Sequence, residues 1–285
     1  MVFRELVAVG SNPLPFTLKP HVNIPFHGML NPISAPITWR TNAQGLREDR
    51  IIPPQSNKYR IATYGDSETF GWSVEEKDTF QKQMEVIDPS VEVINFGVPG
   101  YNVANTADYM EQTALSFHPD LIIYLAHKND IDESIQVNNF ANDFLGWSHA
   151  LLRVRLMYQQ LVLKPKHKRL RQSPARKIFF ARQVDRIVQF CQANQIPLLL
   201  VLLNRQLRAL LREYSQTLSP TPLNTKDSSN QLPRVQFIVV KPIVKPYPKI
   251  DHHLSPKANH ALAEKLCEMV SSTTVGRCVP PGWQW

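Results

Sequence analysis

Several polar residues of this 285-residue chain have the types and order that acyl transfer requires. Ser67 follows a Gly-Asp pair and the apolar run 61–64. A serine hydroxyl becomes a useful nucleophile when a neighbouring imidazole takes its proton and a carboxylate orients that imidazole. His253 and Asp251, late in the chain, supply these two groups. We therefore expect Ser67, His253 and Asp251 to act as nucleophile, base and orienting acid.

The negative oxygen formed by such an attack needs preorganised hydrogen-bond donors. The candidates are the backbone N–H groups of Ser67 and Gly97 and the side-chain amide of Asn129. Gly97 follows the run 91–96, and a glycine there lets a substrate approach the backbone closely. His127 lies two residues before Asn129 and either lines the substrate pocket or packs in the fold. This chemistry needs no metal and no cofactor.

Each of these residues also has a purely structural interpretation. Ser67 could cap a helix, and Asn129 could order a loop through its amide. His252 is adjacent to His253, so spacing alone leaves the identity of the base open. We interpret Asp66 as a hydrogen-bond acceptor that stabilises its turn rather than as a catalytic acid.

The elements that would position these residues alternate between strand and helix from residue 59 to about residue 270. The predicted strands are 61–64, 91–96, 121–125, 197–203 and 235–240. Apolar residues at helical spacing predict helices between them. This alternation predicts an α/β fold in which an open parallel sheet is covered by helices on both faces. The carboxyl ends of its strands would bring the polar residues to one edge of the sheet.

The order and spacing of the polar segments resemble the SGNH (GDSL-type) hydrolase superfamily over residues 60 to about 270. The matching positions are Gly65, Asp66, Ser67, Gly71, Gly97, Asn129, Asp130, Asp251, His253, Ala263 and Glu264. The segment 41–47 is similar to an N-terminal feature of one branch, which includes polysaccharide O-acetyltransferase-like and esterase-like proteins. The resemblance implies a three-layer, flavodoxin-like fold with essential Ser, Gly, Asn and His residues.

Two positions depart from the commonest pattern of the superfamily. Asp251 and His253 are two residues apart rather than three, a spacing that the similar branch tolerates. His127 stands where a glycine is usual, which would narrow that side of the pocket. The resemblance implies a serine esterase or acyl hydrolase that cleaves a small-molecule or carbohydrate ester through an acyl-enzyme. Two alternatives stay open, an O-acyltransferase acting on a sugar hydroxyl and a non-catalytic binding or scaffold protein.

The segments that flank or interrupt the expected core, residues 57–275, are less regular. Residues 1–56 are rich in proline and predict an arm of loops and short edge strands. Residues 131–175 form an insertion in the strand–helix alternation. Its apolar and basic part, 151–177, is a solvated face, a lid or a segment that contacts a membrane surface. The last segment, 276–285, is expected to be a tail.

Composition narrows the class of protein further. Hydrophobic residues make up 43% of the chain and charged residues 20%, which is typical of a soluble globular protein. The net charge of +8 is concentrated in one basic segment, so we expect no nucleic-acid partner. Neither a signal peptide nor a membrane-spanning run is recognisable, which predicts a cytoplasmic protein. The cysteines predict reduced thiols, and a Cys267–Cys278 disulfide is the alternative.

Overall fold

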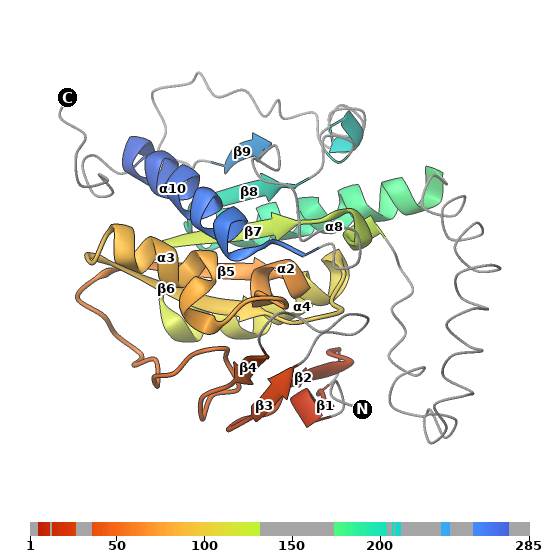
Figure 1. The fold of residues 1–285 in the computed structure, drawn as a ribbon. Helices are drawn as coiled ribbons and strands as arrows, with labels where there is room; N and C mark the ends of the chain where they lie inside the picture. The colour runs from red at the N-terminus through yellow and green to blue at the C-terminus, as the bar shows by residue number, and fades with distance from the viewer. Residues whose placement is uncertain are drawn as a thin grey trace, which may run out of the picture.

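The structure is a computed structural model of the chain (Figure 1). It describes residues 5–11, 13–26, 36–131, 174–203, 207, 209–211, 235–239 and 253–273. Asp251 and His252 lie outside the described residues. So do most of the insertion, including residues 151–173 of its apolar and basic part, and the tail 276–285.

The central sheet has five parallel strands in the order β6-β5-β7-β8-β9 (Figure 1). Their bounds are β5 Tyr59–Gly65, β6 Val91–Gly97, β7 Leu121–Ala126, β8 Leu198–Leu202 and β9 Val235–Val239. Numbered along the chain, this is the 2-1-3-4-5 order of flavodoxin-like folds, and each strand begins and ends within two residues of its predicted place. The predicted α/β fold is confirmed. Ligands of such sheets bind where the strand order reverses, which here is the carboxyl end of β5.

Helices cover both faces of this sheet (Figure 1). α4 and α8 pack together on one face, and α3 and α10 pack together on the other. The longer helices are α3 Phe80–Ile87, α4 Val103–Thr113, α8 Pro174–Ala193 and α10 Pro256–Thr273. Short ones are α2 Ser67–Phe70, η1 Glu76–Asp78, η2 Ala114–Phe117 and η3 Lys128–Ile131.

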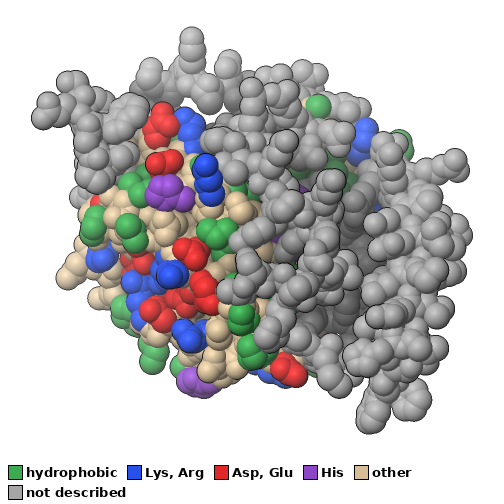
Figure 2. Space-filling model, viewed as in Figure 1, with side chains coloured by type: hydrophobic (Ala, Val, Ile, Leu, Met, Phe, Trp, Pro, Cys, Tyr) green, Lys and Arg blue, Asp and Glu red, His purple; other side chains and the backbone are tan. Residues whose placement is uncertain are grey.

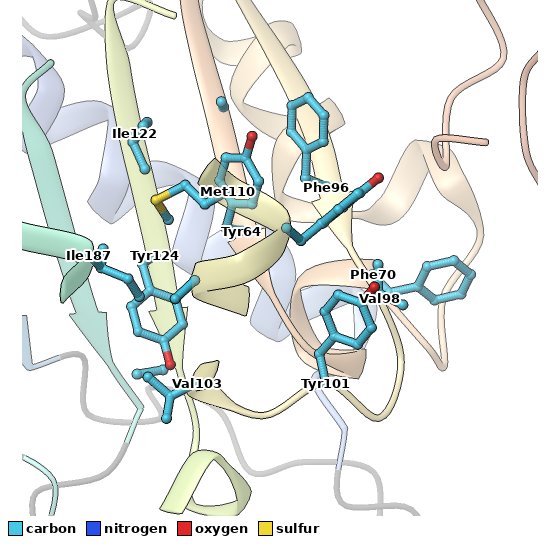
Figure 3. Close-up of a cluster of buried hydrophobic side chains, with 14 of the residues drawn as sticks. Tyr64, Phe70, Phe96, Val98, Tyr101, Val103, Met110, Ile122, Tyr124 and Ile187 are labelled. Carbon is cyan, nitrogen blue, oxygen red and sulfur yellow. The ribbon is translucent and has the colours of Figure 1, made fainter. Parts of the chain in front are cut away.

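Two clusters of buried apolar side chains fill the layers on either side of the sheet. Successive strand residues point to opposite faces, so Tyr64 belongs to one cluster and Ile61 to the other. Tyr64 on β5 stacks on Phe96 of β6 with ring centroids 4.7 Å apart (Figure 3). These layers hold the carboxyl ends of β5 and β6 rigidly beside each other.

The N-terminal arm forms two small antiparallel sheets of its own. β1 Val7–Val9 pairs with β2 Phe16–Leu18, and β3 Asn23–Phe26 pairs with β4 Ile37–Arg40. Strands were predicted for this arm, and these four pair with one another rather than extending the central sheet. The two sheets lie below β6 and α4 in Figure 1.

Two further findings concern the chain as a whole. Cys191 and Cys267 are buried and carry free thiols. Within the described ranges, none of the helices combines the length and apolar character that crossing a membrane requires.

Candidate active site

Ser67 is the first residue of α2, directly beyond the carboxyl end of β5. Asp66 caps this helix, because its side chain accepts the Glu68 N–H at 2.9 Å. The helix lasts a single turn and ends at Gly71. Ser67 is half-buried, so its side chain keeps some access to solvent. The sequence prediction of a strand, a tight turn and a helix around Ser67 is therefore confirmed.

His253 is the imidazole that reaches this serine. Its Nε2 atom lies 2.8 Å from Ser67 Oγ, the distance of a hydrogen bond between a nucleophile and its base. The His253 ring also lies against the indole of Trp72, with ring centroids 6.0 Å apart. The structure thus brings together two of the three expected triad residues. The third, Asp251, lies outside the described residues.

The loop that carries His253 is held by contacts with two helices. The Leu254 N–H donates to Glu68 Oε2 on α2 at 3.0 Å. On α10, the Asn259 side chain donates to the Leu254 carbonyl and accepts the Phe80 N–H of α3. Neither Glu68 nor Asn259 was a candidate in the sequence. Both are buried polar side chains, a property that the sequence alone does not reveal.

Gly97, the predicted oxyanion donor, is the buried last residue of β6. Its N–H donates to Asn95 Oδ1 at 2.9 Å, so this donor is already engaged within the protein. A Cβ atom at residue 97 would lie 2.2 Å from the backbone nitrogen of Phe70. The prediction for Gly97 is corrected on this ground. The glycine allows α2 to pack closely on β6, and its N–H faces a protein acceptor.

Gly100, three residues further on, was missed in the sequence. It is half-exposed and has a φ of 88°, a conformation that strongly favours glycine. Its N–H donates no hydrogen bond within the part of the chain that the structure describes. The Val98 N–H donates to the Gly65 carbonyl at 3.1 Å, which holds this loop beside the turn that carries Ser67. The signal for Gly100 was a second glycine directly after a proline.

The segment after β7 approaches the same turn. Asn129 lies in η3, at the end of the strand next to β5, so its backbone occupies the predicted edge of the sheet. His127 donates its N–H to Asp130 Oδ2 at 2.6 Å, and its Nδ1 atom lies 3.8 Å from Asp66 Oδ2. His127 therefore links the turn after β5 to the turn after β7. Asp66 acts as the turn-stabilising acceptor that the sequence predicted, and Asp130 has the same role in the turn after β7.

Burial dominates the electrostatics of this segment. It raises the pKa of Asp130 well above its usual range, and the neighbouring Asp66 carboxylate acts in the same direction. The Tyr124 hydroxyl interacts with Asp130, and burial likewise raises the pKa of Tyr124 well above its usual range. Two carboxylates close together in a dry environment resist simultaneous ionisation. The Asp130 carboxyl therefore stays protonated to a higher pH than an exposed aspartate does.

Arg47, in the segment that resembles the N-terminal feature of one branch, binds the end of α2. Its guanidinium donates to the Phe70 carbonyl at 2.7 Å, to the Gly71 carbonyl, and to the Val74 carbonyl at 2.6 Å. It also lies over the Phe70 ring, 4.5 Å from the centroid. Only 1% of Arg47 is exposed, and burial lowers its pKa to about 10, so it stays charged at neutral pH. A cation at the carboxyl end of a helix is favourably placed.

Aromatic residues fasten the arm to the same region. Trp39 on β4 packs on Trp72 with ring centroids 4.2 Å apart, and its Nε1–H donates to the Trp72 carbonyl at 3.1 Å. Trp72 is the residue whose ring lies against His253. On the loop of Gly100, the Tyr101 hydroxyl donates to the Phe16 carbonyl of β2. The arm therefore contacts the segments that carry the nucleophile and the candidate oxyanion donor.

The described residues contain one group of carboxylates with the spacing of a cation site, Glu48, Asp49 and Glu76. Lys82 on α3 already occupies it. The Lys82 Nζ atom lies 2.6 Å from Glu48, 3.7 Å from Asp49 and 3.8 Å from Glu76. Side chains of both charges are intermixed on the face of the molecule that carries α3 (Figure 2). This group fastens the arm to α3 by ion pairs.

Comparisons with known proteins were made for the whole chain. No protein-family model matches it, and no curated protein matches it. Among solved structures, the psychrotrophic esterase EstA from Pseudoalteromonas sp. covers 76% of this chain and 98% of its own length, with 10% identity and a TM-score of 0.49.

Two other solved structures are similar over comparable lengths. A member of the lipolytic protein G-D-S-L family from Veillonella parvula DSM 2008 covers 74% of this chain and 98% of its own, with 13% identity and a TM-score of 0.46. AlinE4, an SGNH-hydrolase family esterase, covers 77% and 98%, with 16% identity and a TM-score of 0.35. These three solved structures are an esterase, a lipolytic protein of the G-D-S-L family and an esterase of the SGNH-hydrolase family.

Proposed function

We propose that this protein is a serine esterase or acyl hydrolase that cleaves a carboxylic ester through an acyl-enzyme. The observation that carries the proposal is the 2.8 Å contact between His253 Nε2 and Ser67 Oγ. His253 accepts the Ser67 proton as the oxygen attacks the ester carbonyl, and it then gives this proton to the leaving alcohol. In the second half-reaction His253 takes a proton from water as the water oxygen attacks the acyl-Ser67 ester. The bond between the acyl carbon and Ser67 Oγ then breaks, His253 returns the proton to Ser67 Oγ, and the acid is released.

The other groups are assigned roles around this pair. Asp251, two residues before His253, orients the imidazole. The oxyanion is held by the Ser67 N–H, the Gly100 N–H and the Asn129 amide. The Ser67 N–H is supported as a donor by its place at the start of α2, where N–H groups have no partner within the helix. Gly100 is supported by its half-exposed position and the lack of an acceptor for its N–H within the described residues.

His127 is assigned to the wall of the substrate pocket. It is half-buried beside Asp66, the residue that precedes the nucleophile. An imidazole at this position narrows the approach to Ser67 more than a glycine would. This favours a small acyl group in the pocket.

The test is the reaction of the protein with a fluorophosphonate probe and with p-nitrophenyl acetate. We expect labelling and turnover by the native protein and neither by Ser67→Ala. His253→Ala should label at least about 100-fold more slowly, because the general base is lost. Ser116→Ala, which alters an exposed serine on η2, is the matched control and should behave like the native protein.

Two results would contradict the proposal. Labelling that survives Ser67→Ala would show that another residue is the nucleophile. A folded native protein that neither labels nor turns over ester would indicate a binding or scaffold protein.

A further inference from the structure

Glu68 follows the nucleophile directly and has no part in the mechanism above. Only 3% of this residue is exposed. A buried carboxylate destabilises the folded protein unless it is paired or hydrogen-bonded. An apolar side chain at this position would therefore give a more stable fold. The retention of a carboxylate next to Ser67 therefore calls for a specific role.

Glu68 connects the nucleophile to the base through its backbone and its side chain. Its backbone belongs to α2, which begins at Ser67 and is capped by Asp66. Its Oε2 atom accepts the N–H of Leu254, the residue that follows His253, at 3.0 Å. Ser67 and His253 are 186 residues apart in the sequence. This hydrogen bond thus fixes the backbone of the base relative to the helix of the nucleophile.

The charge of Glu68 adds an electrostatic effect to this mechanical one. A carboxylate close to an imidazole favours the protonated imidazolium. Imidazolium is the form of His253 that exists once Ser67 has given up its proton. The Glu68 carboxylate bonds the N–H of the residue next to His253 at 3.0 Å, so its charge would stabilise this form from the α2 side.

The other described titratable groups around this turn are Asp66 at the start of α2, Arg47 at its carboxyl end, Tyr124 of β7, Asp130 of η3, and His127 between these two elements. His127 contacts both Asp66 and Asp130, and Arg47 donates to backbone carbonyls at the end of α2. On α10, Lys257 and His260 are exposed, and His260 bonds Gln83 of α3. The Glu68 carboxylate bonds the His253 loop directly, through the Leu254 N–H.

We propose that Glu68 is a positioning residue that holds His253 against Ser67 and stabilises the imidazolium with its negative charge. This rests on the proposed roles of Ser67 and His253. It assigns a function to the residue after the nucleophile, where an apolar side chain would only fill the core.

The test compares Glu68→Gln, whose amide oxygen can still accept the Leu254 N–H, with Glu68→Ala, which removes both the bond and the charge. We expect Glu68→Gln to keep KM while kcat/KM for p-nitrophenyl acetate falls about tenfold, because imidazolium is less stabilised. The acid limb of its pH profile should move to lower pH. Glu68→Ala should lose about 100-fold in kcat, because His253 is no longer held in place.

A second readout does not depend on activity. The titration of the His253 ring is followed by NMR in the native protein and in Glu68→Gln, with His253→Gln to assign the signal. We expect the midpoint in Glu68→Gln to lie at lower pH. Glu111→Gln, which alters an exposed carboxylate on α4 paired with Arg186, is the control and should leave the midpoint unchanged.

The outcomes separate the two proposals. An unchanged His253 midpoint in Glu68→Gln overturns the electrostatic role, and native kcat in a folded Glu68→Ala protein overturns the positioning role. If the native protein does not react with ester while the midpoint still moves, the proposed function fails but the contact of Glu68 with the His253 loop stands.

Discussion

Gly97 and Gly100 show at the scale of single residues how two glycines in one loop serve different purposes. Gly97 is required by a close approach, since any side chain would meet the backbone of α2. Gly100 is required by its positive φ of 88°, a conformation that other residues rarely adopt. The first glycine concerns the stability of the fold, and the second concerns the proposed oxyanion site.

Adding one methyl group should therefore mainly lower stability at residue 97 and mainly lower activity at residue 100. Gly97→Ala should lower the free energy of unfolding by about 3 kcal/mol, because the contact is with backbone and cannot be relieved by a rotamer change. Gly100→Ala should cost only about 1 kcal/mol, the strain of a positive φ, while kcat falls as the N–H shifts.

Urea denaturation and p-nitrophenyl acetate kinetics of both variants check this. Equal stability of the two variants would contradict the packing role of Gly97. Native kcat in Gly100→Ala would argue against its N–H as an oxyanion donor.

At the scale of elements, α2 is too short to be stable by itself. A helix of four residues makes very few internal hydrogen bonds, so its position depends on the elements around it. Asp66 satisfies its amino end, and Arg47 from the arm satisfies its carboxyl end. The Glu68 carboxylate ties it to the loop of His253. The nucleophile is therefore held by its neighbour Asp66 and by two segments that are distant in sequence, the arm and the loop of His253.

Arg47 offers the clearest test of this dependence. Arg47→Lys keeps the positive charge but cannot reach three carbonyls with the planar fork of a guanidinium. We expect the free energy of unfolding to fall by about 2 kcal/mol. Fluorophosphonate labelling should also slow, because α2 is held less firmly. If only the charge of Arg47 matters, the free energy of unfolding and the labelling rate will both stay unchanged. Thermal denaturation and labelling rates measure the two effects, and Arg40→Lys on the exposed side of β4 is the matched control.

At the scale of the whole molecule, the arm and the α/β core are joined by the ion pairs around Lys82. Glu48 lies at their centre, with a fully buried side chain. Burial raises the pKa of Glu48 from 4.5 to about 7, although the neighbouring Lys82 lowers it. The folded protein therefore holds a proton that the unfolded chain loses near pH 4.5.

This linkage predicts how stability depends on pH. Between pH 4.5 and about 7 the folded state binds more protons at Glu48, so this contribution to stability is full at the acid end and is lost as the pH rises. Glu48→Gln replaces the titrating carboxyl with a neutral amide, so the pH-dependent contribution of this residue to stability disappears. The Tm of Glu48→Gln minus that of the native protein should therefore increase from pH 5 to pH 8. A difference that is constant with pH would contradict this, and Glu264→Gln, an exposed carboxylate on α10, is the control.

The parts of this architecture that follow from local pattern could be predicted from the sequence. Apolar runs and helical stripes identify the strands and helices, and strand order then places Ser67 at the carboxyl end of β5. The bond of Gly97 to Asn95 could not be predicted, because local backbone geometry decides it. Nor could the contacts of Arg47 with α2, or of Glu68 with Leu254, since they join segments that only tertiary packing brings together.

Because the rings of Trp72 and His253 lie close together, the fluorescence of Trp72 should report on the state of the base. An imidazolium beside an indole quenches its fluorescence, whereas a neutral imidazole does so far less. Trp72 is buried and lies 6.0 Å from His253, so its emission should follow the protonation state of the base. Formation of an acyl-enzyme would change the surroundings of the same ring. Stopped-flow fluorescence could then follow the state of the site without a chromogenic substrate.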